Sequence, residues 1–221
     1  MKKTIITLSF LIIFISAPAA QNVDGNFDFA TINDYARSSN RDTKLIALNL
    51  LEEALAEGAD SNEIYTILDY LALEGTQYRT TGLVMNDQPD LRQEAVKYLG
   101  QLGTTEALNT LIRVTQVEKE LLVIYETVKA LGIIGINNKN QAVNAITMIF
   151  NKYQQRMPDN RLAILTIEAI DKIGDKNNGI EDRGAIRLLS RIAQGPFHNA
   201  VKDHARQTIQ NLLKYALRES N

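Results

Sequence analysis

The chain has 221 residues, a formal net charge of −2 and no cysteine or tryptophan. The lack of cysteine excludes a disulfide framework and a thiolate metal site, and the slight charge gives no reason to expect nucleic acid or an anionic membrane surface as a partner. Alanine, leucine and isoleucine dominate, which favours helices.

The first twenty residues are typical of a secretory signal peptide. Two lysines follow Met1, an apolar stretch runs from 5 to 15, and small residues at 16–20 form an Ala-x-Ala cleavage site. We expect cleavage after Ala19, with Ala20 as the alternative. An uncleaved membrane anchor is the other interpretation, but the stretch is shorter than the roughly 20 apolar residues of a spanning helix.

Export therefore predicts a periplasmic or secreted protein that is not inserted in a membrane after cleavage. Loss of Lys2 and Lys3 changes the net charge from −2 to −4. The next segment, residues 20–40, is polar with isolated aromatic residues, and we interpret it as a leader followed by a capping helix. The remaining domain is expected at residues 41–217.

This domain is predicted to be helical throughout. Apolar residues recur three and four apart almost continuously from Leu45 to Leu217, and strand-like alternation does not extend over more than a few residues. Glycines follow the apolar runs at regular intervals, and each is predicted to end a helix in the left-handed conformation. These glycines are Gly58, Gly75, Gly103, Gly135, Gly174 and Gly195.

The segment 75–87 interrupts this pattern between two helices. Its apolar residues Leu83, Val84 and Met85 have no helical partners of their own in the sequence. Insertions between repeats often contact ligands, so these three residues are candidates for partner binding. The alternative is that the segment folds back over the first helices.

An internal repeat determines the expected architecture. Residues 90–103 are echoed at 122–135 and 163–174, with weaker copies starting near Leu45 and Val201. Second amphipathic stretches lie between the copies, so each unit is a helical hairpin that must stack on its neighbours to bury its apolar side. The second helices are predicted at 62–74, 105–117, 140–156 and 181–193.

Residues 88–103 resemble a known signature. Pro89, Arg92, Ala95, Gly100 and Gly103 fit the Pro-x-x-Arg-x-x-Ala-x-x-x-Leu-Gly-x-x-Gly pattern of HEAT repeats, particularly the short bacterial kind also seen in phycobilin-lyase-like proteins. The resemblance covers about residues 41–215 and is strongest at 89–135. It implies an all-α fold, a right-handed α-α superhelix of about four to five hairpins whose second helices line a concave face. The residues alone also allow a plain helical bundle, and the later copies lack the proline and arginine, which leaves the exact repeat count open.

The face of the second helices carries the main candidate site. Asn109, Arg113 and Gln116 share one face of the 105–117 helix, and three arginines four residues apart form a stripe on the last second helix: Arg183, Arg187 and Arg191. Arginine clamps carboxylates and phosphates bidentately, so the pattern predicts an acidic peptide or protein segment as partner. The alternative is a solvated helix face balanced by Glu181 and Asp182.

Enzymatic chemistry has little support in the residues. His198 and His204 are six apart, which does not place them on one helix face. The segment 175–182 resembles a calcium loop, but Gly179 stands at its fifth position and an EF-hand requires glycine at the sixth. The HEAT-like oxygenases that bind iron use His-Glu dipeptides, and this sequence has none.

We therefore expect no catalytic residue, no metal and no cofactor. The favoured function is a non-catalytic interaction module or scaffold of the bacterial envelope that binds an extended or acidic partner on its concave face. Two other classes stay open: an accessory subunit or enzyme acting on envelope material, and a structural protein that associates with itself.

Overall fold

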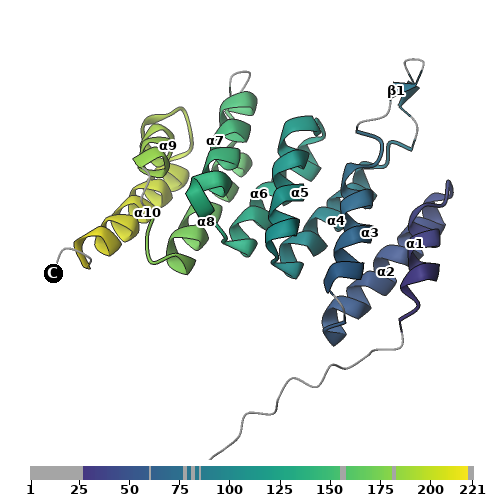
Figure 1. Cartoon of the computed structure of the whole chain (residues 1–221). Helices are drawn as coiled ribbons and strands as arrows, with labels where there is room; N and C mark the ends of the chain where they lie inside the picture. Colours follow the sequence, from purple (N-terminus) through teal and green to yellow (C-terminus); the bar gives the residue numbers. More distant parts are fainter. Residues whose placement is uncertain are drawn as a thin grey trace, which may run out of the picture.

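The computed structural model describes residues 27–59, 61–76, 79–80, 83–84, 86–154, 158–180 and 183–218. The helices of this part follow one another along an elongated molecule with α1 and α10 at opposite ends (Figure 1). Their bounds are α1 Phe29–Ala36, α2 Arg41–Glu57, α3 Ser61–Leu73, α4 Pro89–Leu102, α5 Thr105–Val117, α6 Leu121–Ile134, α7 Gln141–Gln154, α8 Asn160–Lys176, α9 Arg183–Gln194 and α10 Asn199–Arg218. A short 3-10 helix, η1 Asn138–Asn140, precedes α7. None of the described helices is long and apolar enough to cross a membrane.

The helices form two layers. The first layer contains α2, α4, α6, α8 and α10, and the second contains α1, α3, α5, α7 and α9; within each layer, every helix packs against the next. The hairpins α2/α3, α4/α5, α6/α7 and α8/α9 therefore stack as repeated units, with α1 and α10 as single helices at the ends of the described part. The fold is the predicted all-α superhelical solenoid.

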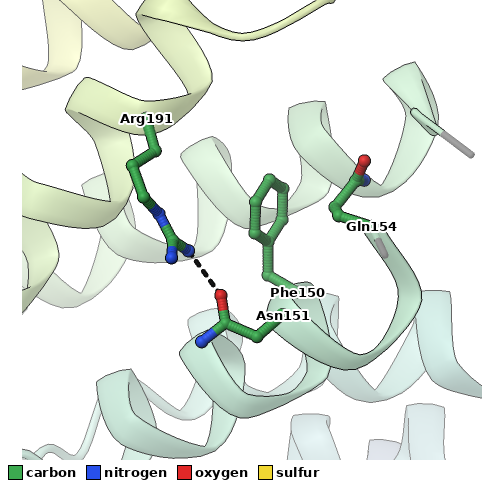
Figure 2. A pocket seen from close by; sticks show the side chains of 4 residues that line it. All are labelled: Phe150, Asn151, Gln154 and Arg191. Atoms are coloured by element: carbon green, nitrogen blue, oxygen red, sulfur yellow. Dashed lines mark hydrogen bonds between the residues drawn. The ribbon is translucent and has the colours of Figure 1, made fainter. Parts of the chain in front are cut away.

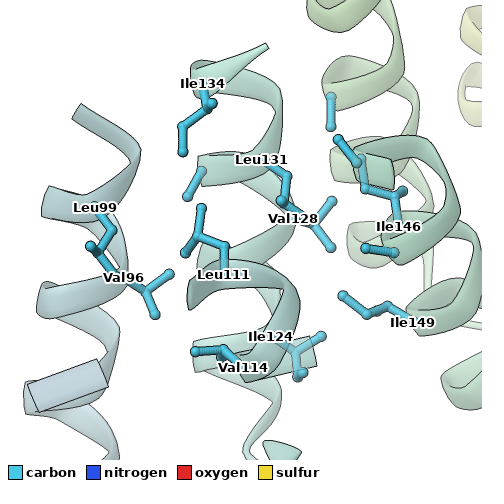
Figure 3. Packing of buried hydrophobic residues seen from close by; sticks show 14 of the residues in the cluster. Val96, Leu99, Leu111, Val114, Ile124, Val128, Leu131, Ile134, Ile146 and Ile149 are labelled. Atoms are coloured by element: carbon cyan, nitrogen blue, oxygen red, sulfur yellow. The ribbon is translucent and has the colours of Figure 1, made fainter. Parts of the chain in front are cut away.

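A continuous apolar core lies between the layers. Figure 3 shows Val96 and Leu99 of α4 near Leu111 of α5, and Val128 of α6 near Ile146 of α7. All five side chains are fully buried. They occupy the periodic positions of the repeat, so each hairpin covers the apolar side of its neighbour.

The first layer is packed backbone against backbone at two glycines. A Cβ atom on Gly100 would lie 2.8 Å from the Cβ of Ala130, and one on Gly132 would lie 2.7 Å from the Cα of Ala169. No side chain larger than hydrogen fits at either place without a shift of the backbone. The close approach explains why the repeat requires glycine there.

Most of the predicted glycine caps are confirmed. Gly58, Gly75, Gly103 and Gly135 have positive φ angles of 72°, 75°, 70° and 67°. The prediction is wrong for Gly174, which lies inside α8, where Leu212 of α10 occupies the space that a side chain would need. It is also wrong for Gly195, which follows α9 without a positive φ.

The segment between α3 and α4 contains structure that the sequence did not predict. The strands β1 Arg79–Thr80 and β2 Leu83–Val84 form a short antiparallel pair, with Arg79 opposite Val84 and Thr80 opposite Leu83. The base of the segment is tightly closed, because a Cβ on Gly75 would lie 2.7 Å from the carbonyl oxygen of Asn86.

Helix α1, Phe29–Ala36, lies within the segment 20–40 that the sequence analysis interpreted as a leader followed by a capping helix. Helix α1 packs against α2 and α3, and the carboxylate of Asp28 caps it by accepting from the backbone N–H of Thr31 at 3.2 Å. The predicted signal peptide, residues 1–19, lies outside the described residues.

Candidate functional site

The outward face of the second helices carries the polar residues of interest. One side of α5, α7 and α9 is buried in the core, and their opposite sides are exposed to solvent. Two open pockets lie on this face, each between two successive second helices. The pockets make this face the candidate functional site.

The first pocket lies between α7 and α9 and has a volume of about 420 Å³. Phe150, Asn151 and Gln154 line it from α7, and Arg191 lines it from α9 (Figure 2). The Phe150 side chain is buried, with its ring centroid 6.1 Å from that of Phe197. The pocket therefore combines an aromatic wall anchored in the core with amide and guanidinium groups at its rim.

Arg191 is held in place by two contacts. Its Nη2 donates a hydrogen bond to Oδ1 of Asn151, drawn as the dashed line in Figure 2, and its guanidinium carbon lies 5.9 Å from the centroid of the Phe150 ring. A guanidinium carries five N–H donors in a planar fork, so one bond to an amide leaves further donors for a carboxylate.

The second pocket lies between α5 and α7 and has a volume of about 410 Å³. It combines amide groups with apolar side chains and one lysine from η1. Its lining residues are Asn109, Ile112 and Gln116 of α5, Gln141, Asn144, Ala145 and Met148 of α7, and Lys139. Met148 is 43% exposed and is therefore one of the exposed large apolar side chains of the described part.

The predicted arginines are only partly brought together. Arg183, Arg187 and Arg191 are all exposed on α9, and Arg191 lines the pocket against α7. Arg113 does not join them, because it lies on α5 and its Nη1 is 3.0 Å from Oδ1 of Asp69 on α3. This ion pair offsets the charge of Arg113.

The charge along the face is uneven. Helices α7 and α9 contain Lys152 and the three stripe arginines but no aspartate or glutamate. Helix α5 contains both Glu106 and Arg113. The α7 and α9 end of the face therefore favours an acidic ligand.

The other predicted binding residues were Leu83, Val84 and Met85. Leu83 and Val84 form β2, which pairs with β1 outside the two helical layers, and Met85 lies outside the described residues.

An ion network centred on the buried Arg92 lies at the connections between hairpins, with Glu118 buried and Asp87 45% exposed. Arg92 of α4 donates from Nε to Oε2 of Glu118 at 2.7 Å and from Nη1 to Oδ1 of Asp87 at 2.7 Å. Burial lowers the pKa of Arg92, but the hydrogen bonds to Glu118 and Asp87 outweigh this effect and raise the pKa above its ordinary value. Glu118 also accepts from the backbone N–H groups of Lys119 and Glu120. Arg92, the arginine of the repeat signature, therefore joins the α3–α4 connection to the α5–α6 connection.

Potential metal ligands do not cluster in the described part of the chain. It contains no group of three or more histidine, aspartate or glutamate residues placed to hold a metal ion. His198 lies directly before α10, and its backbone N–H donates to Oδ1 of Asn160 at 3.0 Å. Residues 181 and 182, the end of the segment that resembles a calcium loop, lie outside the described part.

Several lining residues were missed by the sequence analysis. Phe150 lies at a core position of α7, and Met148 and Gln154 share no motif with the arginines. Periodicity identifies which residues share one helix face, but not which faces of two helices meet. The sequence offered one signal that could have identified these lining residues, namely their position on a predicted second helix.

Residues 91–116 match the family model of the PBS lyase HEAT-like repeat. The matched segment covers most of α4 and α5, which is one hairpin of the stack. The chain has no significant match among curated proteins or among solved structures. The matched hairpin and the stacked units around it support the description of the chain as a HEAT-repeat protein.

Proposed function

We propose that the protein is a non-catalytic interaction module that binds an extended, acidic segment of a protein partner on the face of α5, α7 and α9. The observation that carries the proposal is the pocket between α7 and α9, where Arg191 lies at the rim beside the Phe150 ring and neither helix contains an acidic residue. HEAT-like repeats commonly mediate contacts between proteins. In HEAT-like solenoids the second helices usually line the concave surface, and this supports placing the partner on the face of α5, α7 and α9.

The mechanism is surface complementarity that exists before binding. Each hairpin is fixed by its neighbours through the shared core, so little ordering of the protein is needed when a partner binds. Asn151 orients the Arg191 guanidinium before a ligand arrives, and a carboxylate can then be bound with two parallel N–H bonds. Contacts over two adjacent pockets add to the affinity.

We also propose that the protein acts in the bacterial envelope after export. The amino-terminal sequence supports this, with its two lysines, its apolar stretch and the small residues before Ala20. Mass spectrometry of the chain recovered from the periplasmic fraction tests it. Cleavage after Ala19 or Ala20 is expected, and an intact Met1 in that fraction would contradict export through a cleaved signal.

The binding proposal is tested by affinity capture from an envelope extract. The mature chain is compared with a stripe variant carrying Arg183→Glu, Arg187→Glu and Arg191→Glu. We expect a partner that the parent retains and the stripe variant loses, with unchanged helical circular dichroism. A matched control carries three charge reversals at exposed lysines outside the second helices: Lys129→Glu, Lys172→Glu and Lys214→Glu.

The control separates a local effect from a change in net charge, because both variants change the charge equally. Retention of the partner by the control and its loss by the stripe variant place the site on the second-helix face. Equal capture by all three proteins contradicts this location, and no capture by the parent contradicts the interaction function itself.

A further inference from the structure

The two helices that end the first layer each expose a large apolar side chain. Ile46 of α2 and Leu213 of α10 are both 50% exposed. The two helices lie toward opposite ends of the elongated molecule (Figure 1). Among the described elements, α2 packs against α1, α3 and α4, and α10 packs against α8 and α9. Terminal units of repeat proteins usually have a polar outer face, and these two exposed residues depart from that rule.

On α2, Ile46 belongs to a stripe that is apolar at its start and acidic at its end. This α2 stripe consists of Ile46, Leu50, Glu53 and Glu57, which are four, three and four residues apart. At 3.6 residues per turn, the four positions lie within about 60° of one another around the helix axis. Leu50 is half-buried, and both glutamates are exposed. From residue 45 to its end, α2 contains three glutamates and no lysine or arginine.

On α10, Leu213 belongs to a stripe that is basic at its start and apolar at its end. This α10 stripe consists of Lys202, Arg206, Ile209 and Leu213, again four, three and four residues apart. Arg206 is exposed, and Lys202 and Ile209 are half-buried. Asp203, the single acidic residue of α10, forms an ion pair with Arg206. A guanidinium has five N–H donors, so this pair leaves Arg206 able to bind a second carboxylate.

The two stripes are complementary when their helices run in opposite directions. The spacing of four, three and four is the same from either end, so each residue of one stripe then faces a residue of the other. The pairs are Ile46 with Leu213, Leu50 with Ile209, Glu53 with Arg206, and Glu57 with Lys202. In the parallel direction, charged residues would face apolar ones throughout. Both stripes are about 16 Å long, so one contact can include all four pairs.

We propose that the partner at the ends of the solenoid is a second copy of this chain, with α10 of one copy packed antiparallel on α2 of the next through the two stripes. Each copy has one stripe of each kind, so the contact is heterologous and links copies head to tail, in a ring or an open chain. A contact of one helix on one helix is smaller than the roughly 1,200–2,000 Å² of stable interfaces, so the association is weak and depends on concentration. It uses no residue of the second-helix face and is independent of the proposed function.

Sedimentation equilibrium of the mature chain, up to about 0.5 mM protein, tests the association itself. We expect the average mass to rise above that of the monomer as the concentration increases. A mass that stays at the monomer value over the whole range would overturn the inference.

Charge reversal tests the pairing of the stripes. An α2 variant carries Glu53→Lys and Glu57→Lys, and an α10 variant carries Lys202→Glu and Arg206→Glu. Each variant alone places like charges opposite each other and should stay monomeric, whereas an equal mixture of the two should associate again because their charges are complementary. The matched control, Lys129→Glu with Lys172→Glu, reverses exposed charges in the middle of the first layer and should associate like the parent.

A mixture that stays monomeric, or a control that loses association, would contradict the pairing. Unchanged helical circular dichroism shows that each variant is folded. Leu213→Asp should also abolish association, whereas Leu122→Asp, at a 54% exposed position of α6, should not. Equal effects of these two substitutions would show that the contact is not at the ends.

Cross-linking tests the direction of the helices, because the chain has no cysteine of its own. The variant Ile46→Cys with Leu213→Cys should give disulfide-linked oligomers under mild oxidation, since the antiparallel contact places these positions opposite each other. The matched control, Ile46→Cys with Lys202→Cys, would be cross-linked only in the parallel direction and should stay monomeric on a non-reducing gel. Cross-linking of the control to the same extent, or none in the first variant, would overturn the antiparallel contact.

Discussion

The two layers of the solenoid use the same kind of helix in different ways. In the first layer, α4, α6 and α8 approach so closely that Gly100 faces Ala130 and Gly132 faces Ala169. In the second layer, successive helices leave open pockets of about 410 and 420 Å³ between them. The first layer therefore fixes how the units stack, and the second layer leaves surface that a partner can occupy.

One arginine ion pair in each layer shows the same difference between close packing and exposure. Arg92 of the first layer and its partner Glu118 have side chains that are 3% and 2% exposed, whereas Arg113 of the second layer and its partner Asp69 are 46% and 26% exposed. The Arg113 pair connects α5 with α3 of the neighbouring hairpin, and the Arg92 pair connects α4 with the end of α5. Removing one partner should cost far more at the buried pair, because it leaves a buried charge unpaired, whereas solvent screens the charge left at the exposed pair.

The largest expected effect comes from breaking the buried pair. Arg92→Met leaves the buried Glu118 carboxylate without its charged partner, which should lower the free energy of unfolding by about 3–5 kcal/mol. Arg113→Met, the matched change in the second layer, should lower it by less than about 1 kcal/mol. Urea denaturation followed by circular dichroism measures both values.

The double variant Arg92→Met with Glu118→Gln tests the cause of this loss. It removes the unpaired charge, so it should recover part of the stability lost in Arg92→Met. Equal losses for Arg92→Met and Arg113→Met would show that the two layers do not differ in the way proposed here.

A smaller effect is expected from adding side-chain volume to each layer. Gly132→Val in α6 places methyl groups against the backbone of Ala169, which should lower the free energy of unfolding by at least about 2 kcal/mol. Ala145→Val in α7 borders an open pocket and should lower it by less than about 1 kcal/mol. Thermal and urea unfolding measure the loss of stability in both variants. A larger loss for Ala145→Val than for Gly132→Val would show that the first layer is not the more tightly packed one.

The sequence predicted the repeated helices well because their signals are local. The second helices expected at 62–74 and 105–117 are observed at Ser61–Leu73 and Thr105–Val117. Apolar spacing and left-handed glycines act within one helix, and both can be read along the chain. The cap predicted at Gly174 was wrong because its cause is tertiary: Leu212 of α10 packs where a side chain would lie. The strands β1 and β2 are too short to produce an alternating pattern.

The candidate site could be predicted only in part, because it also depends on contacts between residues far apart in the sequence. The spacing of Arg187 and Arg191 places them on one face of one helix. The contact between Arg191 and Asn151 joins residues 40 apart, and the pair that occupies Arg113 joins residues 44 apart. Such contacts depend on how hairpins stack, which the helical period does not specify.

The smallest expected effect concerns Tyr125, which links two helices of the first layer. Its hydroxyl donates to the Asp159 carboxylate that caps α8, and burial followed by this hydrogen bond raises the pKa of Tyr125 from 10.0 to about 12. Because the folded protein favours the protonated hydroxyl, this contribution to stability is complete below pH 10 and is lost as the pH rises toward 12. In Tyr125→Phe this group is absent, so its urea midpoint should fall less than that of the parent between pH 9 and 11.5. The lysines titrate in both proteins, so their effect cancels when the two are compared. If the urea midpoints of parent and variant fall in parallel with pH, the contact between Tyr125 and the cap of α8 does not stabilise the first layer.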